Sequence, residues 1–255
     1  MFVDSHTHLY LESFSDDRDK VIERAIKNGV TKMFLPNIDS RTIQPLCDLA
    51  DSYRDNCFPM MGLHPGSVNE NYKKELIIIE KQIQKRDFIA IGEIGIDLYR
   101  NKTFLNEQEA VFTIQIEWAK NLGLPIVIHA RDSFKEIFKV LDKLWEPGLR
   151  GVFHSFTGNR QEAKRALSYD FFIGINGIVT FKNNDIAEIV EEIPINLILL
   201  ETDAPFLSPV PFRGKRNESS YLIHIAGKIS EIHKLSIGQV AEETTRNANN
   251  LFIKR

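Results

Sequence analysis

The sequence is poor in cysteine, in long apolar runs and in excess basic charge, and each shortage excludes a class of protein. Only Cys47 and Cys57 occur in 255 residues, too few for a disulfide scaffold, so we expect ordinary buried thiols. The most apolar stretches, residues 76–79 and 197–200, are too short to cross a bilayer. The N-terminus also lacks the basic start and apolar run of a secretion signal. We therefore expect a cytoplasmic protein with no membrane partner.

The charges of the chain nearly balance, with 32 Lys and Arg against 35 Asp and Glu and a net charge of −3. This balance excludes a general electrostatic attraction to nucleic acid or to an anionic membrane. An anionic partner would have to be held by a local group of basic residues. Nothing in the composition indicates an obligate protein partner.

The chain also lacks a Gly-x-Gly-x-x-Gly turn after its first apolar run, the usual mark of an open dinucleotide-binding sheet. It has instead eight short, mostly solid apolar runs, as parallel strands covered on both faces require. The predicted strands are residues 2–6, 31–36, 58–63, 88–94, 125–130, 151–156, 171–175 and 197–203. Their alternation with helical segments predicts an α/β fold, a (β/α)8 TIM barrel, with residues 1–255 forming a single domain.

The segments between these runs carry helix start and stop signals. Gly and capping residues indicate helices over residues 16–28, 40–53 and 106–122, and a capping box before a last helix. The residues concerned are Gly29 and Gly123 as stops, Ser40 and Asn106 as caps, and Ser236 with Gln239 as the capping box.

The first ten residues, MFVDSHTHLY, place polar side chains at alternate positions after two apolar residues. In an extended chain alternate side chains share one face, so Asp4, His6 and His8 would point the same way. Neutral imidazoles on one face can bind a cation together. A pair of ordinary surface histidines fits this short motif equally well, so the rest of the chain has to decide.

Metal-ligand residue types recur where the other predicted strands end, which in a barrel is the functional rim. In addition to His6 and His8, these are His64, Glu93, His129, His154, Glu201 and Asp203. Any one of these residues could instead be a hydrogen-bonded core residue. So many residues of metal-ligand type at strand ends favour a metal centre. Six of them, His6, His8, Glu93, His129, His154 and Asp203, could converge, and these four imidazoles and two carboxylates exceed the needs of one tetrahedral ion. They suit two adjacent divalent cations, with a carboxylate such as Glu93 shared.

A basic loop follows the eighth predicted strand. Arg213, Lys215 and Arg216 lie in its RGKR run, and Arg131 comes two residues after His129. Guanidinium groups pair with phosphate oxygens, so these four residues are candidate substrate contacts for a phosphate-containing ligand. An ordinary solvated loop is the alternative. Phe206 and Phe212 flank the loop and could stack on an unpaired base, although phenylalanine is more often buried.

In combination and in order, these motifs resemble the TatD-type metal-dependent deoxyribonucleases, which belong to the amidohydrolase-like barrels. The resemblance extends from Asp4 to Ser220 and into the final helices. It rests on DSHTHL, GLHP, GEIGID, VIHARD, GVFHSFTG and LLETDAPFLSPVPFRGKRNES. It implies a single metal-dependent hydrolase domain that cleaves phosphodiester bonds in DNA, often from the 3′ end.

The resemblance also implies how the site residues divide. His6 and His8 would bind one metal, Glu93 would bridge, and His129 and His154 would hold the second. Asp203 would be a further ligand or a proton acceptor, and we assign it the task of orienting or deprotonating the attacking water. We expect His64 to contact the phosphate or to protonate the leaving oxygen, with a structural role in the GLHP turn as the alternative.

The metal and the substrate stay open at this stage. Histidine-rich ligation suits Zn²⁺, Ni²⁺ or Mn²⁺, whereas Mg²⁺ prefers oxygen ligands. The leading hypothesis is a deoxyribonuclease acting on single strands or ends, with DNA or an oligonucleotide held by the basic loop. A metal-dependent amidohydrolase or esterase of a small molecule is the alternative, because a fold does not fix a substrate. A non-catalytic binding protein is disfavoured by the intact set of ligand-type residues.

Overall fold

The computed structural model describes residues 1–99, 102–182 and 185–253 of the chain. All eight predicted strands are present, and all pair in parallel with their neighbours. They are β1 (Phe2–Asp4), β2 (Val30–Leu35), β3 (Cys57–Pro59), β4 (Ile91–Asp97), β5 (Ile126–Arg131), β6 (Gly151–Phe153), β7 (Phe172–Ile175) and β8 (Ile198–Leu200). The fold is the predicted α/β barrel.

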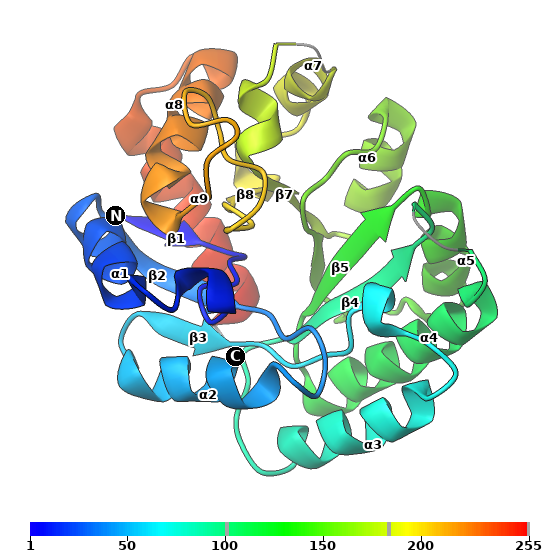
Figure 1. Cartoon of the computed structure of the whole chain (residues 1–255). Helices are drawn as coiled ribbons and strands as arrows, with labels where there is room; N and C mark the ends of the chain where they lie inside the picture. Colours follow the sequence, from blue (N-terminus) through cyan, green and yellow to red (C-terminus); the bar gives the residue numbers. More distant parts are fainter. Residues whose placement is uncertain (100–101, 183–184, 254–255) are drawn as a thin grey trace.

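The strands form two sheets in sequence order, β1-β2-β3 and β4-β5-β6-β7-β8. Backbone hydrogen bonds close both gaps between the sheets. Just after β3, Met61 pairs with Ile91 of β4 through a parallel bridge, and on the other side the Ser5 amide donates to the Leu200 carbonyl at 3.0 Å. The barrel therefore has no open strand edge at either junction (Figure 1).

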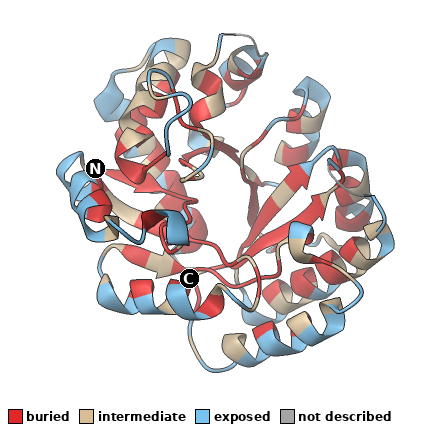
Figure 2. Cartoon of the chain, viewed as in Figure 1, coloured by how far each residue is buried: buried red, intermediate tan, exposed pale blue. Residues whose placement is uncertain are grey.

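Helices surround the barrel on the outside, with their apolar faces on the strands and their polar faces outward (Figures 1 and 2). The described α-helices are α1 (Arg18–Lys27), α2 (Ile43–Ser52), α3 (Tyr72–Ile83), α4 (Leu105–Leu122), α5 (Phe134–Leu144), α6 (Arg160–Leu167), α7 (Ile186–Glu192), α8 (Leu222–His233) and α9 (Ile237–Phe252). Short 3-10 turns lie at Glu12–Phe14, Pro65–Ser67, Gly177–Thr180, Ile195–Leu197 and Ser219–Tyr221.

Helix α5 shows why these segments pack as they do. Phe134, Ile137, Phe138 and Leu141 follow the i, i+3, i+4, i+7 spacing that puts side chains on one helical face, and all are buried. The Phe134 and Phe138 rings lie about 6 Å from the ring of Phe153 on β6 (6.0 and 5.8 Å between centroids). Each such side chain contributes roughly 1.5–3 kcal/mol through burial.

The helix boundaries agree with the sequence signals at three ends and differ at two others. Helix α1 ends at Lys27, and Gly29 follows in the left-handed conformation (φ 83°). Gly123 ends α4 in the left-handed conformation (φ 64°), and Ser236 with Gln239 forms the predicted capping box of α9. The Asn106 cap is wrong, because α4 already begins at Leu105. The Ser40 cap is also wrong: α2 begins at Ile43, and the Ser40 hydroxyl donates instead to Glu75 at 2.9 Å.

The inside of the barrel has an apolar layer at the amino ends of the strands. Side chains from the strands meet there with the end of α9, whose Leu251 and Phe252 cover this side. The members on the strands or directly beside them are Val3, Phe34, Met60, Ala90, Val127, Val152 and Leu199. This layer leaves the opposite, carboxyl end of the barrel for polar side chains.

Among the residues described, no helix combines the length and the apolar composition that a bilayer-spanning segment needs.

Candidate metal centre

The strand period carries polar side chains above the apolar layer inside the barrel. On β5, His129 lies two residues beyond Val127, and after β8, Glu201 lies two residues beyond Leu199. Since alternate residues of a strand share a face, these polar groups point into the same interior as the apolar layer below them. His154 follows Val152 in the same way at the end of β6.

Glu93 reaches the interior through an irregularity in β4, not by ending the strand as its sequence suggested. Strand β4 continues to Asp97. Its residues Ile91 and Ile94 pair with Ile126 and Ile128 of β5, so β4 has one extra residue in this interval. Such a bulge re-aims a side chain. Gly95 adapts the strand beside it: its φ is 142°, and a Cβ there would lie 2.1 Å from the His129 carbonyl oxygen.

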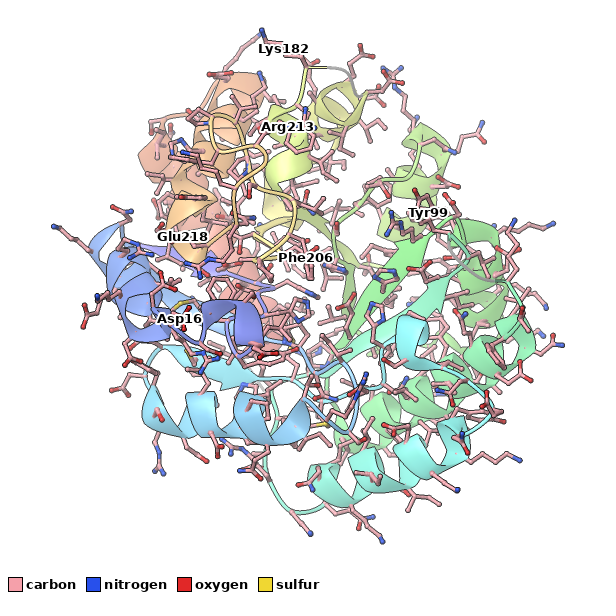
Figure 3. All side chains as sticks on the ribbon, viewed as in Figure 1. Asp16, Tyr99, Lys182, Phe206, Arg213 and Glu218 are labelled. Carbon is pink, nitrogen blue, oxygen red and sulfur yellow. The ribbon has the colours of Figure 1, made fainter. Side chains whose placement is uncertain are left out.

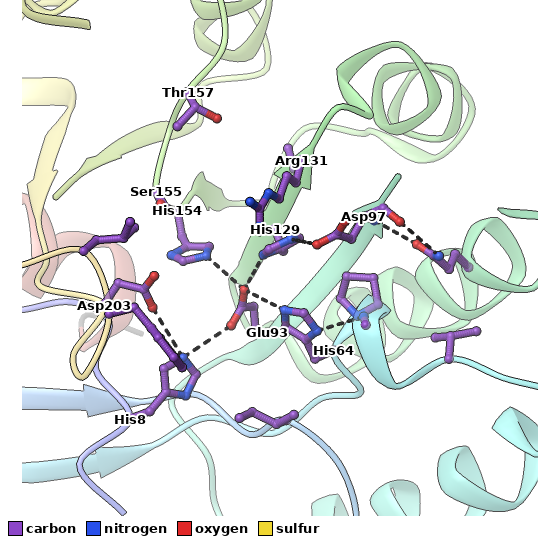
Figure 4. Close-up of a pocket in the computed structure, with 18 of the residues that line it drawn as sticks. His8, His64, Glu93, Asp97, His129, Arg131, His154, Ser155, Thr157 and Asp203 are labelled. Atoms are coloured by element: carbon purple, nitrogen blue, oxygen red, sulfur yellow. Dashed lines mark hydrogen bonds and ion pairs between the residues drawn. The ribbon is translucent and has the colours of Figure 1, made fainter. Parts of the chain in front are cut away.

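One carboxylate oxygen of Glu93 faces the histidines of the first motif. Glu93 Oε2 lies 3.2 Å from His6 Nε2 and 3.7 Å from His8 Nε2. Asp203 Oδ1 lies 3.7 and 3.5 Å from the same two nitrogens, which are themselves 3.2 Å apart. Four ligand-type atoms, from the segment after β1, from β4 and from the segment after β8, therefore lie close together; Figure 4 shows His8, Glu93 and Asp203 of this group.

The other oxygen of Glu93 faces a second group of imidazoles. Glu93 Oε1 lies 2.7 Å from His129 Nδ1, 2.9 Å from His154 Nε2 and 3.3 Å from His64 Nε2. Glu93 itself is almost fully buried, with 2% of its surface exposed. The carboxylate thus stands between two separate groups of nitrogen donors (Figure 4).

The hydrogen bonds behind His8 fix which of its nitrogens carries a lone pair. Tyr10 donates its hydroxyl proton to the Pro36 carbonyl at 2.6 Å, so the Tyr10 oxygen accepts from His8 Nδ1 at 2.8 Å. The proton of neutral His8 therefore lies on Nδ1, and the lone pair on Nε2 faces Glu93 and Asp203. Orientation of a metal-binding imidazole by such a bond is typical of metal sites.

Carboxylates do the same for two imidazoles of the second group. Asp97 Oδ2 accepts from His129 Nε2 at 3.0 Å, and Glu201 Oε1 accepts from His154 Nδ1 at 3.2 Å. The opposite ring nitrogen of each histidine, which faces Glu93, is then free to act as a ligand.

His64 differs from these histidines in the position of its proton. Its Nδ1 accepts the Gly66 backbone N–H at 2.8 Å, so the proton of the neutral ring lies on Nε2. Because an N–H cannot coordinate a cation, the nitrogen that His64 presents to the pocket is a hydrogen-bond donor. This separates His64 from the ligand-type histidines.

These donors fit a pair of divalent cations. Ligands bound at 2.0–2.2 Å with tetrahedral or octahedral angles are about 2.8–3.6 Å apart, and the contacts around the two Glu93 oxygens range from 2.7 to 3.7 Å. Two overlapping groups of ligand-type atoms, His6–His8–Asp203 and His6–Glu93–His154, each lie within 4.8 Å of one another. A third such group, His64–Glu93–His129, includes His64, whose pocket-facing nitrogen carries a proton. Buried His6 Nδ1 has no hydrogen-bond partner among the described residues, whereas His6 Nε2 faces the cluster.

The electrostatics keep the carboxylates charged. Burial alone would raise the pKa of Glu93, but the imidazoles around it, His154 first, hold that pKa well below its usual range. Burial likewise opposes ionisation of Asp203, but its hydrogen bond with His8 and the charges of the nearby imidazoles together outweigh burial and lower its pKa. Burial disfavours the charged form of His6 and lowers the pKa of that ring. Burial also acts to lower the pKa values of His129 and His154, but their carboxylate partners outweigh it and raise both. Bound cations would take the place of those protons, so these carboxylates and imidazoles form a ligand set for cations.

A pocket of about 830 Å³ opens above this cluster. Its walls include Arg131 and Phe206, with Pro65 and Asn69 on the turn after β3. The Arg131 guanidinium lies over the exposed ring of Tyr99, 3.8 Å from its centroid. The pocket thus has a cation, Arg131, beside the cluster (Figure 4) and two aromatic rings, Phe206 and Tyr99, near its opening (Figure 3).

The structure does not bring the predicted RGKR cations into this pocket. Arg216 makes a bidentate pair with Asp17 at 2.8 Å and donates to the Ser13 carbonyl, so its donors hold the loop against the start of α1. Arg213 lies over the Phe181 ring, 4.1 Å from its centroid. Lys215, like these two, is not among the described residues that line the pocket. Of the four predicted basic contacts, only Arg131 lines it.

Three residues that support the site were not predicted as functional. Tyr10 continues the alternation of the first motif, and Asp97 is an acid at the true end of β4, so both had a sequence signal. Asp4 lies one layer deeper, where its carboxylate accepts from the Thr202 amide at 2.9 Å and from the hydroxyl at 2.6 Å. Burial raises the pKa of Asp4 to about 7. These bonds fasten the start of the chain to the segment that carries Asp203.

Comparison with known proteins yields a consistent result. Residues 3–253 match the sequence model of the family described as TatD related DNase. A Bacillus subtilis protein described as the uncharacterized metal-dependent hydrolase YabD is 36% identical over 253 residues, with 99% of each chain covered. An Erwinia tasmaniensis protein described as 3′-5′ ssDNA/RNA exonuclease TatD is 33% identical, with 98% of each chain covered.

The fold also matches a solved structure. The crystal structure of YJJV, a TatD homologue from Escherichia coli, superposes with a TM-score of 0.93 over 100% of this chain and 98% of that one, at 26% identity.

Proposed function

The chain belongs to the TatD-related DNase family and is a metal-dependent hydrolase, and on this premise we propose that it removes nucleotides from the 3′ end of single-stranded DNA. The proposal takes the reaction from relatives named as 3′-5′ ssDNA/RNA exonucleases. The observation that supports it most is that the two carboxylate oxygens of Glu93 face separate groups of imidazole nitrogens. That arrangement suits a pair of cations bridged by one carboxylate.

In this proposal His6, His8 and Asp203 hold one cation, His129 and His154 hold the other, and Glu93 is shared. Bound divalent cations would lower the pKa of a water and neutralise the phosphoryl oxygens. The rest of the chemistry falls to the chain itself.

Asp203 is proposed to orient the attacking water and to accept its proton. The carboxylate is ionised because its pKa lies below the usual value, and 14% of its side chain is exposed to the pocket. As the water oxygen bonds to phosphorus, the P–O3′ bond breaks, and the proton of the water passes to Asp203. The product keeps the phosphate on the released 3′-terminal nucleotide.

His64 is proposed to protonate the leaving O3′. Its Nε2–H faces the pocket because its Nδ1 is occupied by the Gly66 amide. Burial lowers the pKa of His64, which keeps the ring neutral, so Nε2–H acts as a hydrogen-bond donor that gives up its proton only as charge develops on the leaving oxygen.

Arg131 is proposed to bind a phosphate of the strand. It is exposed in the pocket wall, and among the described residues no carboxylate forms an ion pair with it. Its stacking on Tyr99 holds the guanidinium plane in place, which favours bidentate binding of a phosphate.

The test is hydrolysis of a 5′-labelled single-stranded oligonucleotide, with and without exhaustive chelation by EDTA. We expect a ladder shortened from the 3′ end, loss of activity on chelation, and recovery with Mg²⁺, Mn²⁺, Zn²⁺ or Ni²⁺. RNA, duplex DNA and a cyclic amide serve as competing substrates. Full activity after chelation, or turnover of the cyclic amide alone, would contradict the proposal.

Metal content gives a second measure of the proposed site. We expect Glu93→Gln to retain less metal than the wild-type protein in elemental analysis after dialysis. His224→Gln is the matched control, because His224 lies on α8 against Phe212, away from the pocket. Equal metal in the wild type and Glu93→Gln would remove Glu93 from the bridge.

A further inference from the structure

Two phenylalanines flank the basic loop between β8 and α8, and the structure gives them different surroundings. Phe212 is stacked on Tyr221, with 4.0 Å between ring centroids and 7° between ring planes, and has His224 at its edge. Its ring is therefore already used within the fold. Phe206 has no such partner: no described residue stacks on its ring or holds a cation over it.

Phe206 lies in the pocket wall beside the metal-ligand cluster. Its ring centroid is 6.3 Å from that of His8 in a T-shaped arrangement, and 52% of its surface is exposed. Figure 3 shows it on the β8–α8 loop beside the barrel opening, with Tyr99 across that opening. An aromatic face thus stands free next to the position proposed for the scissile phosphate.

The backbone holds Phe206 firmly although its side chain is exposed. The Phe206 amide donates to the Asp203 carbonyl at 2.9 Å, and the Phe206 carbonyl accepts from Asn217 Nδ2 at 2.6 Å. Asn217 is fully buried and also donates to the Thr202 carbonyl at 2.8 Å. A ring on so fixed a backbone loses little freedom when a ligand stacks on it.

We propose that Phe206 is a stacking platform for the unpaired base of the 3′-terminal nucleotide. The inference rests on the proposed nuclease function and deepens it by identifying a residue that selects single strands. A base in a duplex is already stacked on its neighbours, whereas an unpaired terminal base has a free face. Every base has such a face, so the platform tolerates any sequence.

The position of Asp203 indicates which nucleotide stacks. Attacking and leaving oxygens lie in line on opposite sides of phosphorus. Water oriented by Asp203 therefore puts the leaving O3′, with the penultimate nucleotide attached, on the side away from Asp203. The terminal nucleotide is joined through an equatorial oxygen and so lies closer to Asp203 than the leaving strand does, and Phe206 is there, with its amide bonded to the Asp203 carbonyl.

The experiment measures kcat/KM on oligonucleotides with an intact 3′ end, with an abasic 3′-terminal nucleotide, and with an abasic penultimate nucleotide. We expect the wild-type protein to prefer the intact end over the terminal abasic end about tenfold, mainly through KM. Phe206→Leu should lose this preference, because it keeps an apolar side chain without a ring face. Phe206→Tyr should restore it.

Phe212→Leu is the matched control, since it removes a ring from the same loop that does not line the pocket, and it should keep the wild-type preference. Thermal melting confirms that each variant is folded. Retention of the preference by Phe206→Leu, or a wild-type preference that depends only on the penultimate base, would overturn the inference. Absence of hydrolysis of every oligonucleotide by the wild-type protein would instead refute the proposed function.

Discussion

Replacing Asp203 with Asn tests the proposed proton acceptor with little disturbance of the fold. Asp203 has a left-handed backbone conformation, with φ 55°, that few residues other than glycine adopt easily. Asn is among those that tolerate it, and its side chain has the same shape. The substitution therefore removes one negative charge, and with it the capacity to accept a proton, from a position 3.5 Å from His8 Nε2.

The expected loss follows from what Asp203 contributes. A positioned general base is worth about 10²- to 10⁴-fold in rate, which corresponds to about 3–5 kcal/mol of transition-state stabilisation. We expect kcat to fall by that factor with KM changed less than about threefold, because Arg131 and Phe206 still hold the substrate. The melting temperature should stay close to that of the wild type, since the backbone conformation is kept.

The assay is single-turnover hydrolysis of a labelled oligonucleotide at saturating metal, over a range of pH. Burial and the hydrogen bond with His8 act oppositely on Asp203, with a net lowering of its pKa. Asp203 therefore stays ionised at a lower pH than an ordinary carboxylate. Protonation of Asp203 should not reduce the wild-type rate until the pH falls below the usual carboxylate range. A kcat of Asp203→Asn within about threefold of wild type would refute the assignment. A loss confined to KM would make Asp203 a binding residue.

Three further predictions concern other parts of the molecule. Burial opposes ionisation of Glu218, but the bidentate pair with Arg24 keeps its pKa low, so Glu218→Gln should cost about 1–3 kcal/mol of unfolding free energy near neutral pH. In urea denaturation, the difference in unfolding free energy between wild type and Glu218→Gln should disappear as the pH falls through the pKa of Glu218 in the folded protein. A difference that persists in acid would contradict this prediction. Burial raises the pKa of Cys57 to about 12, so a thiol reagent should modify it only after unfolding, and rapid native labelling contradicts this. Arg131→Ala should lower the slope of log K for oligonucleotide binding against log salt concentration by about one unit. Arg216→Ala should leave that slope unchanged and lower the melting temperature. Equal slopes in the two variants would contradict the placement of both arginines.

The barrel and the identity of the clustered residues could be predicted from the sequence because both depend on local patterns. Solid apolar runs between helical segments require parallel strands covered on both faces, and the ends of such strands meet at one rim. His129 and His154 follow their buried strand residues at the expected spacing. Their roles as metal ligands stay predictions.

The inward position of Glu93 and the pairing of Arg216 with Asp17 depend on tertiary structure, so local sequence patterns could not predict them. Strand period alone puts Ile94 or Gly92 on the interior face with Ala90, and only the extra residue in β4 brings Glu93 inward. Arg216 looked available for phosphate because its partner Asp17 is 199 residues away in the chain. Long-range ion pairs of this kind leave no mark in a local motif.

The hydrogen bonds behind the cluster give the strongest physical argument for cations. Tyr10, Asp97 and Glu201 each hold a proton of one histidine away from the pocket, which turns the lone pairs of those rings toward Glu93. Lone pairs and carboxylate oxygens crowded at 2.7–3.7 Å repel one another unless positive charge lies between them. Burial would lower the pKa values of His129 and His154, but their carboxylate partners raise both, which reflects the same demand for positive charge. The network therefore favours a site that holds positive charge, and bound cations would supply that charge, as the metal dependence of the family leads one to expect.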